Sequence, residues 1–315
     1  MSRSHRLVCP VALCAVVAGA VLSCDHQERN ARACFERGYA LQKAGKYEEA
    51  CEEYAEAVEL DPQLADAYYN WGDALGNLGR HAEACGKFAE AVALNPRDAE
   101  AYSNWGVALE GLGRYAEACE KHAKAVEIKP RFAEAYYGWG VALQKMRKPG
   151  EACEKYARAV EINPRYAKAY CNWGGALQEM GKPGEACEKC AKALEFDPRD
   201  AKAYVNWGNA LDEFRRPAEA CEKYAKAAEL DPRDAATYYN WGVALGNLGR
   251  HAEACDKYAK AVEIDPRYAK AYAGWGTALA LLGKTAEAIE KLDKAAELDP
   301  ALKPQIEEMR KKLLR

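Results

Sequence analysis

The residues with the most obvious chemistry in this sequence are its cysteines, 13 among 315 residues. Cys187 and Cys190 form a CxxC pair, a spacing that serves thiol–disulfide exchange and metal binding. Either function needs a helix N-terminus that stabilises the thiolate, or further ligands such as histidine. This pair lies instead at two expected core positions of one helix, with no histidine beside it. We therefore expect no redox centre and no metal site, and an enzymatic alternative would rest on these two thiols alone.

No other catalytic constellation stands out. The sequence contains no glycine-rich phosphate loop, no CxxCH haem-attachment motif and no separate set of Ser, His and Asp. The formal net charge is −3, from 45 basic and 48 acidic residues, so there is no basic excess of the kind that nucleic-acid binding requires. We expect a non-catalytic protein with no cofactor and no nucleic-acid partner.

Three rows of residues recur at intervals of 34 residues or a multiple of that number, and their side chains could bind a peptide. Side-chain amides, which can pair with both the donors and the acceptors of a peptide backbone, lie at Asn70, Asn104, Asn172, Asn206 and Asn240. Aromatic residues, which we expect to be exposed beside the amides, lie at Phe35, Tyr69, Tyr137 and Tyr239. In the third row the charge changes sign, from Asp66, Glu100 and Glu134 to Lys168, Lys202 and Lys270.

These rows exist because the chain is a tandem array. A 34-residue unit runs without insertion over residues 31–302, and its eight copies start at Ala31, Ala65, Ala99, Ala133, Ala167, Ala201, Ala235 and Ala269. A fixed period of this length is typical of a helical solenoid, whose units bury their apolar faces only by stacking. The sequence therefore predicts one elongated array.

The copy that starts at Ala235 shows how each unit is expected to fold. Apolar residues at spacings of three and four predict a first helix, helix A, through Tyr238, Trp241, Leu245 and Leu248. Gly249 follows, where the end of a helix favours a left-handed residue. A second stripe predicts helix B, which Pro266 ends. Gly242 and Ala254 lie where the two helices would cross closely.

Cysteine and histidine also take fixed places in the copies. Seven cysteines share one helix B position, about 9 to 10 Å apart in neighbouring copies, beyond the about 7 Å limit for a disulfide; they are Cys51, Cys85, Cys119, Cys153, Cys187, Cys221 and Cys255. We interpret them as small buried residues. His81 and His251 occupy the turn that Tyr47 and Tyr115 fill elsewhere, so we interpret them as packing residues.

The pattern of Trp, Gly, Ala, aromatic, Ala and Pro at these places resembles the tetratricopeptide repeat. The resemblance covers 272 of 315 residues. It implies an all-α, right-handed superhelical solenoid of antiparallel helix pairs, in which one face of each helix A lines a concave groove. Residues 303–315 are expected to form a capping helix. The asparagine row resembles the asparagine ladder of the tetratricopeptide superhelix in O-GlcNAc transferase, which implies that these side chains bind an extended peptide, although they could also be solvated surface inherited with the repeat.

The first 24 residues differ in kind. Arg3 and Arg6 precede an apolar run that Pro10 interrupts, and the run is too short to favour a spanning helix. We interpret residues 1–24 as an export signal, followed by a polar tether over residues 25–30. The segment 18–20 suits ordinary cleavage, whereas the segment 21–24 resembles a bacterial lipobox that would make Cys24 the lipidated first residue.

We expect an exported, periplasmic scaffold that binds protein or peptide partners and contacts the membrane only through a lipid on Cys24. Its groove would hold extended segments during assembly of an envelope complex. A structural or self-associating envelope protein is the alternative, and the sequence carries no signal for a particular oligomeric state. The sign change along the third row predicts a ligand with its basic part toward the N-terminal half and its acidic part toward the C-terminal half.

Overall fold

The computed structural model describes residues 29–314, and these residues are helical with no strand among them. The A helices of the predicted copies span residues 29–43, α3 (Ala65–Asn77), α5 (Ala99–Gly111), α7 (Ala133–Lys145), α9 (Ala167–Glu179), α11 (Ala201–Glu213), α13 (Ala235–Asn247) and α15 (Ala269–Leu281). Helix B spans α2 (Tyr47–Leu60), α4 (His81–Leu94), α6 (Tyr115–Ile128), α8 (Pro149–Ile162), α10 (Pro183–Phe196), α12 (Pro217–Leu230), α14 (His251–Ile264) and α16 (Thr285–Leu298). The predicted signal and Cys24 lie outside the described residues.

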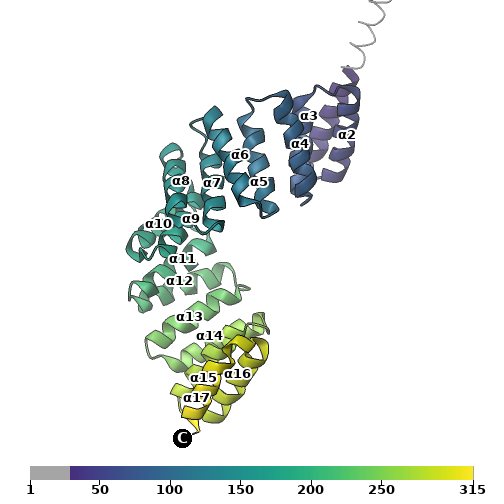
Figure 1. Cartoon of the computed structure of the whole chain (residues 1–315). Coiled ribbons are helices and arrows are strands. Elements are labelled where there is room, and N and C mark those ends of the chain that lie inside the picture. The colour runs from purple at the N-terminus through teal and green to yellow at the C-terminus, as the bar shows by residue number, and fades with distance from the viewer. Residues whose placement is uncertain (1–28, 315) are drawn as a thin grey trace, which may run out of the picture. The chain divides into compact units, whose positions relative to one another are not determined.

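Two compact units make up the described chain, one ending at Arg147 and the other beginning at Lys148. Within each unit, helix A and helix B of a copy pack side by side, and helix B then packs on helix A of the next copy (Figure 1). The all-α architecture of successive helix pairs is therefore confirmed. A short 3₁₀ turn, η1 (Pro300–Leu302), leads into α17 (Lys303–Leu313), which packs on α16 as the predicted cap.

Helix ends follow the expected chemistry. Gly249 has a φ of 73°, in the left-handed region that a residue without Cβ adopts without strain. In the sixth copy Arg215 takes the same conformation with a φ of 61°. Pro217 then opens α12, where its missing N–H would have lacked a helical partner in any case.

The core of the sixth and seventh copies is a large helix B side chain set into a glycine of helix A. A Cβ added to Gly208 would lie 2.6 Å from Cε1 of Tyr224, and one added to Gly242 would lie 2.7 Å from Cε1 of Tyr258. Only glycine lets the ring approach the helix A backbone so closely. The prediction that small residues mark the crossing of the two helices is confirmed at these positions.

A lysine of helix B lies over the ring of a helix A tryptophan in the same copy, which holds the two helices together. The ammonium of Lys257 lies 3.7 Å from the ring centre of Trp241, and that of Lys87 lies 3.5 Å from that of Trp71. Such a cation over an indole face is worth about 0.5 to 2 kcal/mol. The Trp241 ring also packs against the apolar cluster that contains Cys221 of the preceding copy, so this cysteine is a small core residue where two copies meet.

Curvature follows from which helices touch. In each unit successive A helices contact one another, as α3 does α5 and α13 does α15. Successive B helices of the described chain show no comparable contact. Helices that approach each other lie on the inside of a curved stack, so the A helices form the concave face of each unit. None of the described helices is both long enough and apolar enough to span a bilayer.

Candidate functional site

The asparagine row lies on helix A, and its amides connect neighbouring copies. The side-chain nitrogen of Asn104 donates to the Tyr69 hydroxyl at 3.1 Å, and that of Asn206 donates to the Cys171 carbonyl at 3.2 Å. Asn240 donates to Oδ1 of Asn209 at 3.1 Å. These nitrogens therefore have partners inside the chain, and it is the side-chain oxygens that remain to accept from a ligand.

The other two asparagines behave differently. Asn70 donates to the carbonyl of Asp66 in its own helix at 2.8 Å. Asn172 accepts from the ammonium of Lys202 at 2.8 Å. The sequence did not reveal this division between a bond within a helix, bonds across copies and a bond to lysine.

Two glycines interrupt the row for a packing reason. A Cβ at Gly138 would lie 2.5 Å from Cε1 of His122, and one at Gly274 would lie 2.7 Å from Cζ of Tyr258. In both cases the helix B ring of the preceding copy occupies the space that an asparagine would need. His122 is fully buried, and its Nε2 lies 2.9 Å from Oε1 of Glu110. The two interruptions are therefore filled by core rings of the preceding copy.

The aromatic row is not the exposed surface that the sequence predicted. Tyr69, Tyr137 and Tyr239 are only half exposed. The Tyr69 ring lies 6.1 Å from that of Phe88, and the Tyr239 ring lies 6.0 Å from that of Tyr258. Burial raises the pKa of the Tyr69 hydroxyl to about 12. The prediction of exposed aromatics is wrong because these rings lean from helix A onto the helix B ring of their own copy.

Charges at the second position of each copy are partly neutralised in the N-terminal unit. Glu100 forms an ion pair with Lys129 at 2.5 Å, which lowers the pKa of the Glu100 carboxyl. In the C-terminal unit, neither Lys168 nor Lys270 forms an ion pair with a side chain that the structure describes. Two uncompensated ammonium groups therefore lie on the concave side of this unit.

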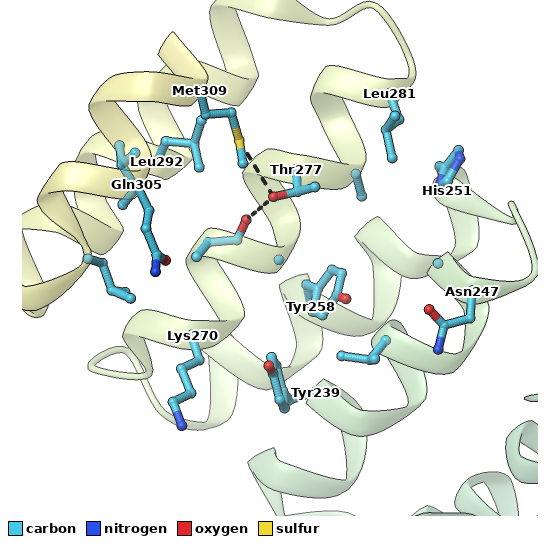
Figure 2. A pocket seen from close by; sticks show the side chains of 17 residues that line it. Tyr239, Asn247, His251, Tyr258, Lys270, Thr277, Leu281, Leu292, Gln305 and Met309 are labelled. Carbon is cyan, nitrogen blue, oxygen red and sulfur yellow. Dashed lines mark hydrogen bonds between the residues drawn. The ribbon is translucent and has the colours of Figure 1, made fainter. Parts of the chain in front are cut away.

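A cavity with a volume of about 490 Å³ lies on the concave face of the C-terminal unit. Residues of α13, α14, α15, α16, η1 and α17 line it, and this volume is typical of ligand pockets. Figure 2 shows Lys270 and Tyr239 toward one end and His251 and Leu281 toward the other. We call this cavity the C-terminal pocket.

A smaller cavity of about 210 Å³ occupies the equivalent place in the N-terminal unit. Its lining includes Gly76, Asn77 and His81, and the C-terminal pocket uses Gly246, Asn247 and His251 at the same positions of their copy. The His81 ring packs over the next copy, 2.5 Å from where a Cβ of Gly111 would lie. We call this cavity the N-terminal pocket. Sequence reasoning noticed neither pocket.

The CxxC pair has the environment of an unreactive core site. Cys190 is fully buried, and burial raises the pKa of both the Cys190 and the Cys187 thiols, opposite to the shift that activates a thiolate. All ten cysteines of the described chain are free thiols. Near the N-terminus, Cys34, Glu53 and Glu56 lie close enough together to hold a metal ion. The Arg37 guanidinium, however, already donates to the Cys34 thiol at 3.2 Å and to Glu53 at 2.9 Å.

Family models confirm the repeat. A "TPR repeat" model matches residues 38–79, and "Tetratricopeptide repeat" models match residues 69–135, 133–166 and 235–268, together just over half of the chain. The chain belongs to the tetratricopeptide repeat family. Proteins of this fold are generally interaction scaffolds that bind protein or peptide partners, and no catalytic family is indicated. No curated protein sequence matches this chain.

Solved tetratricopeptide structures resemble it over most of its length. The crystal structure of YrrB, described as a TPR protein with an unusual peptide-binding site, is 26% identical with a TM-score of 0.50, over 58% of this chain and 95% of YrrB. Cut9 in the APC/C hetero-tetramer Cut9–Hcn1 is 17% identical with a TM-score of 0.63, over 89% of this chain but only 55% of that one. The pilF protein of Pseudomonas aeruginosa is 22% identical with a TM-score of 0.57, over 65% of this chain and 94% of pilF. The last two likenesses concern the fold alone.

Proposed function

We propose that this tetratricopeptide protein is a non-catalytic scaffold that binds extended peptide segments along the concave face of its A helices. The observation that carries the proposal is the C-terminal pocket, because this cavity of about 490 Å³ opens among the A helices. The free oxygens of Asn206 and Asn240 lie on the same face and would accept from a peptide backbone. The unusual peptide-binding site of YrrB, a protein of the same repeat, supports this assignment.

Affinity capture from envelope membranes tests the proposal. A variant with Asn172, Asn206 and Asn240 changed to Ala should lose a partner that the unchanged chain retains, since the row would no longer accept from the ligand. A matched control changes three exposed helix B residues to Ala instead, at Glu195, Glu229 and Glu263. A partner that survives the asparagine changes but not the control changes would place recognition on the convex face and contradict the proposal.

Charge reversal tests the polarity of the ligand. Changing Lys168, Lys202 and Lys270 to Glu should weaken a captured partner by more than tenfold at low salt, because the acidic part of the segment would then face carboxylates. The difference should shrink at about 1 M salt, where charges are screened within about 3 Å. Unchanged affinity at low salt would show that these lysines do not contact the ligand.

We further propose that the scaffold acts at the bacterial envelope, held there by a lipid on Cys24, and assists assembly of an envelope complex. The apolar run before Cys24 and the small residue Ser23 support this. Labelling of the protein by radioactive palmitate in cells, lost in a Cys24→Ser variant, is the expected result. Labelling that persists in the variant would rule out lipidation at this residue.

The alternative is a structural protein that associates with itself and has no dedicated peptide ligand. The row of large apolar residues that end the A helices favours it, because Met180 and Phe214 are 41% and 51% exposed. Sedimentation that depends on protein concentration would support this alternative, whereas a monomer at all concentrations would remove it.

A further inference from the structure

The two pockets share a cause in the sequence. Gly76 and Gly246 occupy the twelfth position of their copies, where the other copies carry Gln, Glu, Asp or Ala. In the first copy that residue is Gln42, which accepts from the Tyr54 hydroxyl at 2.6 Å and so fills the space above the ring. In the third copy Glu110 reaches His122 in the same way. Glycine leaves this space open in the second and seventh copies, where the two pockets lie. A cavity of about 240 Å³ also lies beside Tyr224 in the sixth copy, where the twelfth residue is Asp212.

The C-terminal pocket is more than twice as large as its counterpart because its surroundings differ. Gly274 and Val243 line it, whereas Asn104 and Asp73 stand at the equivalent places in the N-terminal pocket. The cap adds a further apolar wall through Ile306 and Met309 of α17. Thr277 donates to the Ala273 carbonyl at 2.9 Å and to the Met309 sulfur at 3.8 Å, which ties α17 to α15 over the cavity (Figure 2).

Apolar walls and one free charge define what this pocket would accept. Val243, Leu281, Leu292 and Ile306 surround the cavity, and Leu281 is 64% exposed at its rim. Lys270 lies at one end without an ion-pair partner among the described residues. A large apolar side chain gains most by leaving water for such walls, and a carboxylate nearby would neutralise the ammonium.

We propose that the C-terminal pocket anchors a large apolar side chain of an acidic peptide segment, with α17 as one wall and Lys270 holding a neighbouring carboxylate. This inference rests on the proposed function, because it names the part of the ligand that the groove selects. The N-terminal pocket has less than half the volume, and it carries the half-buried carboxylate of Asp73, which disfavours an apolar anchor from an acidic segment. The two units therefore differ in what they select, although they share ten identical residues, 76–85 and 246–255.

The test is to fill the C-terminal pocket with glutamine, which the chain already carries at the twelfth position of other copies. Gly246→Gln copies the arrangement of Gln42, and the new amide can accept from the Tyr258 hydroxyl, which lines the pocket. A Cβ at Gly246 meets no atom within 4 Å, so the fold tolerates the change. Gly76→Gln places the same side chain in the N-terminal pocket, and Gly246→Ala adds one methyl group without filling the cavity.

The probe is a pool of random ten-residue peptides displayed on phage and selected on the purified chain. We expect selected peptides to carry Phe, Leu, Ile or Met within about two residues of Asp or Glu. Gly246→Gln should lower their affinity at least tenfold, while Gly76→Gln and Gly246→Ala leave it within threefold. Lys270→Gln should remove the preference for acidic residues but keep the apolar one.

Two outcomes would overturn the inference in distinguishable ways. If the asparagine variant loses the selected peptides but Gly246→Gln binds them unchanged, the groove binds peptides without this anchor, and only the inference fails. If the unchanged chain selects no peptides above background, the inference and the proposed function fail together.

Discussion

Replacing Tyr224 with alanine is expected to lower the free energy of unfolding of the C-terminal unit by about 3 to 5 kcal/mol, as for other large aromatic residues removed from a core. Tyr224 is 2% exposed, and its ring fills the space that a Cβ of Gly208 would occupy at 2.6 Å. Its hydroxyl donates to Oδ1 of Asn209 at 2.8 Å, and that oxygen also accepts from Asn240. The change would leave a cavity and loosen the row of amides beside it.

Urea unfolding followed by far-ultraviolet circular dichroism measures this loss. Tyr224→Phe is the matched control, because Phe88 holds the same place in the second copy. It removes one hydrogen bond and should cost only about 1 kcal/mol. A loss below about 1 kcal/mol for the alanine variant would mean that the copies do not depend on this contact.

Alkaline pH is expected to unfold the chain between about pH 9 and pH 12. Burial raises the pKa of the Cys171 thiol from 9.0 to about 12 and that of the Tyr69 hydroxyl from 10.0 to about 12. The same cause raises the pKa of Tyr54, Tyr224 and Tyr258. The folded chain keeps protons that the unfolded chain releases, so the stability present below pH 9 is lost as pH rises, by up to about 1.4 kcal/mol per pH unit for each group.

The measurement is urea unfolding at pH 8 and pH 10.5 under reducing conditions. Cys171→Val is the control, since Val205 fills the equivalent position in the next copy and does not titrate. This variant should lose less stability between the two pH values than the unchanged chain. Equal stability of the unchanged chain at both pH values would contradict the account of buried thiols and hydroxyls.

The fold was predictable because each copy contains the residues that define its own two helices. Gly242 lies where the helices cross and Pro266 ends helix B, and the 34-residue period of such residues predicts the positions of the helix pairs. The predicted signal over residues 1–24 and the site at Cys24 stay predictions, as does the handedness of the superhelix.

The site was less predictable because it depends on contacts between copies. At Gly138, a gap in the asparagine row, the His122 ring of the preceding copy packs against helix A, a contact that no pattern within one copy reveals. The burial of Tyr239 results from its lean onto Tyr258. The one signal that could have located the C-terminal pocket was glycine at the twelfth position of two copies, and its size still depends on how α17 docks.

The central claim is that ligands bind the concave face of the A helices, and site-specific photo-cross-linking tests it most directly. A benzoylphenylalanine at Val243, which lines the C-terminal pocket, is compared with one at Glu263 on exposed helix B. We predict a covalent adduct with the captured segment from Val243 and none from Glu263. An adduct from Glu263 alone would contradict the claim and place recognition on the convex face.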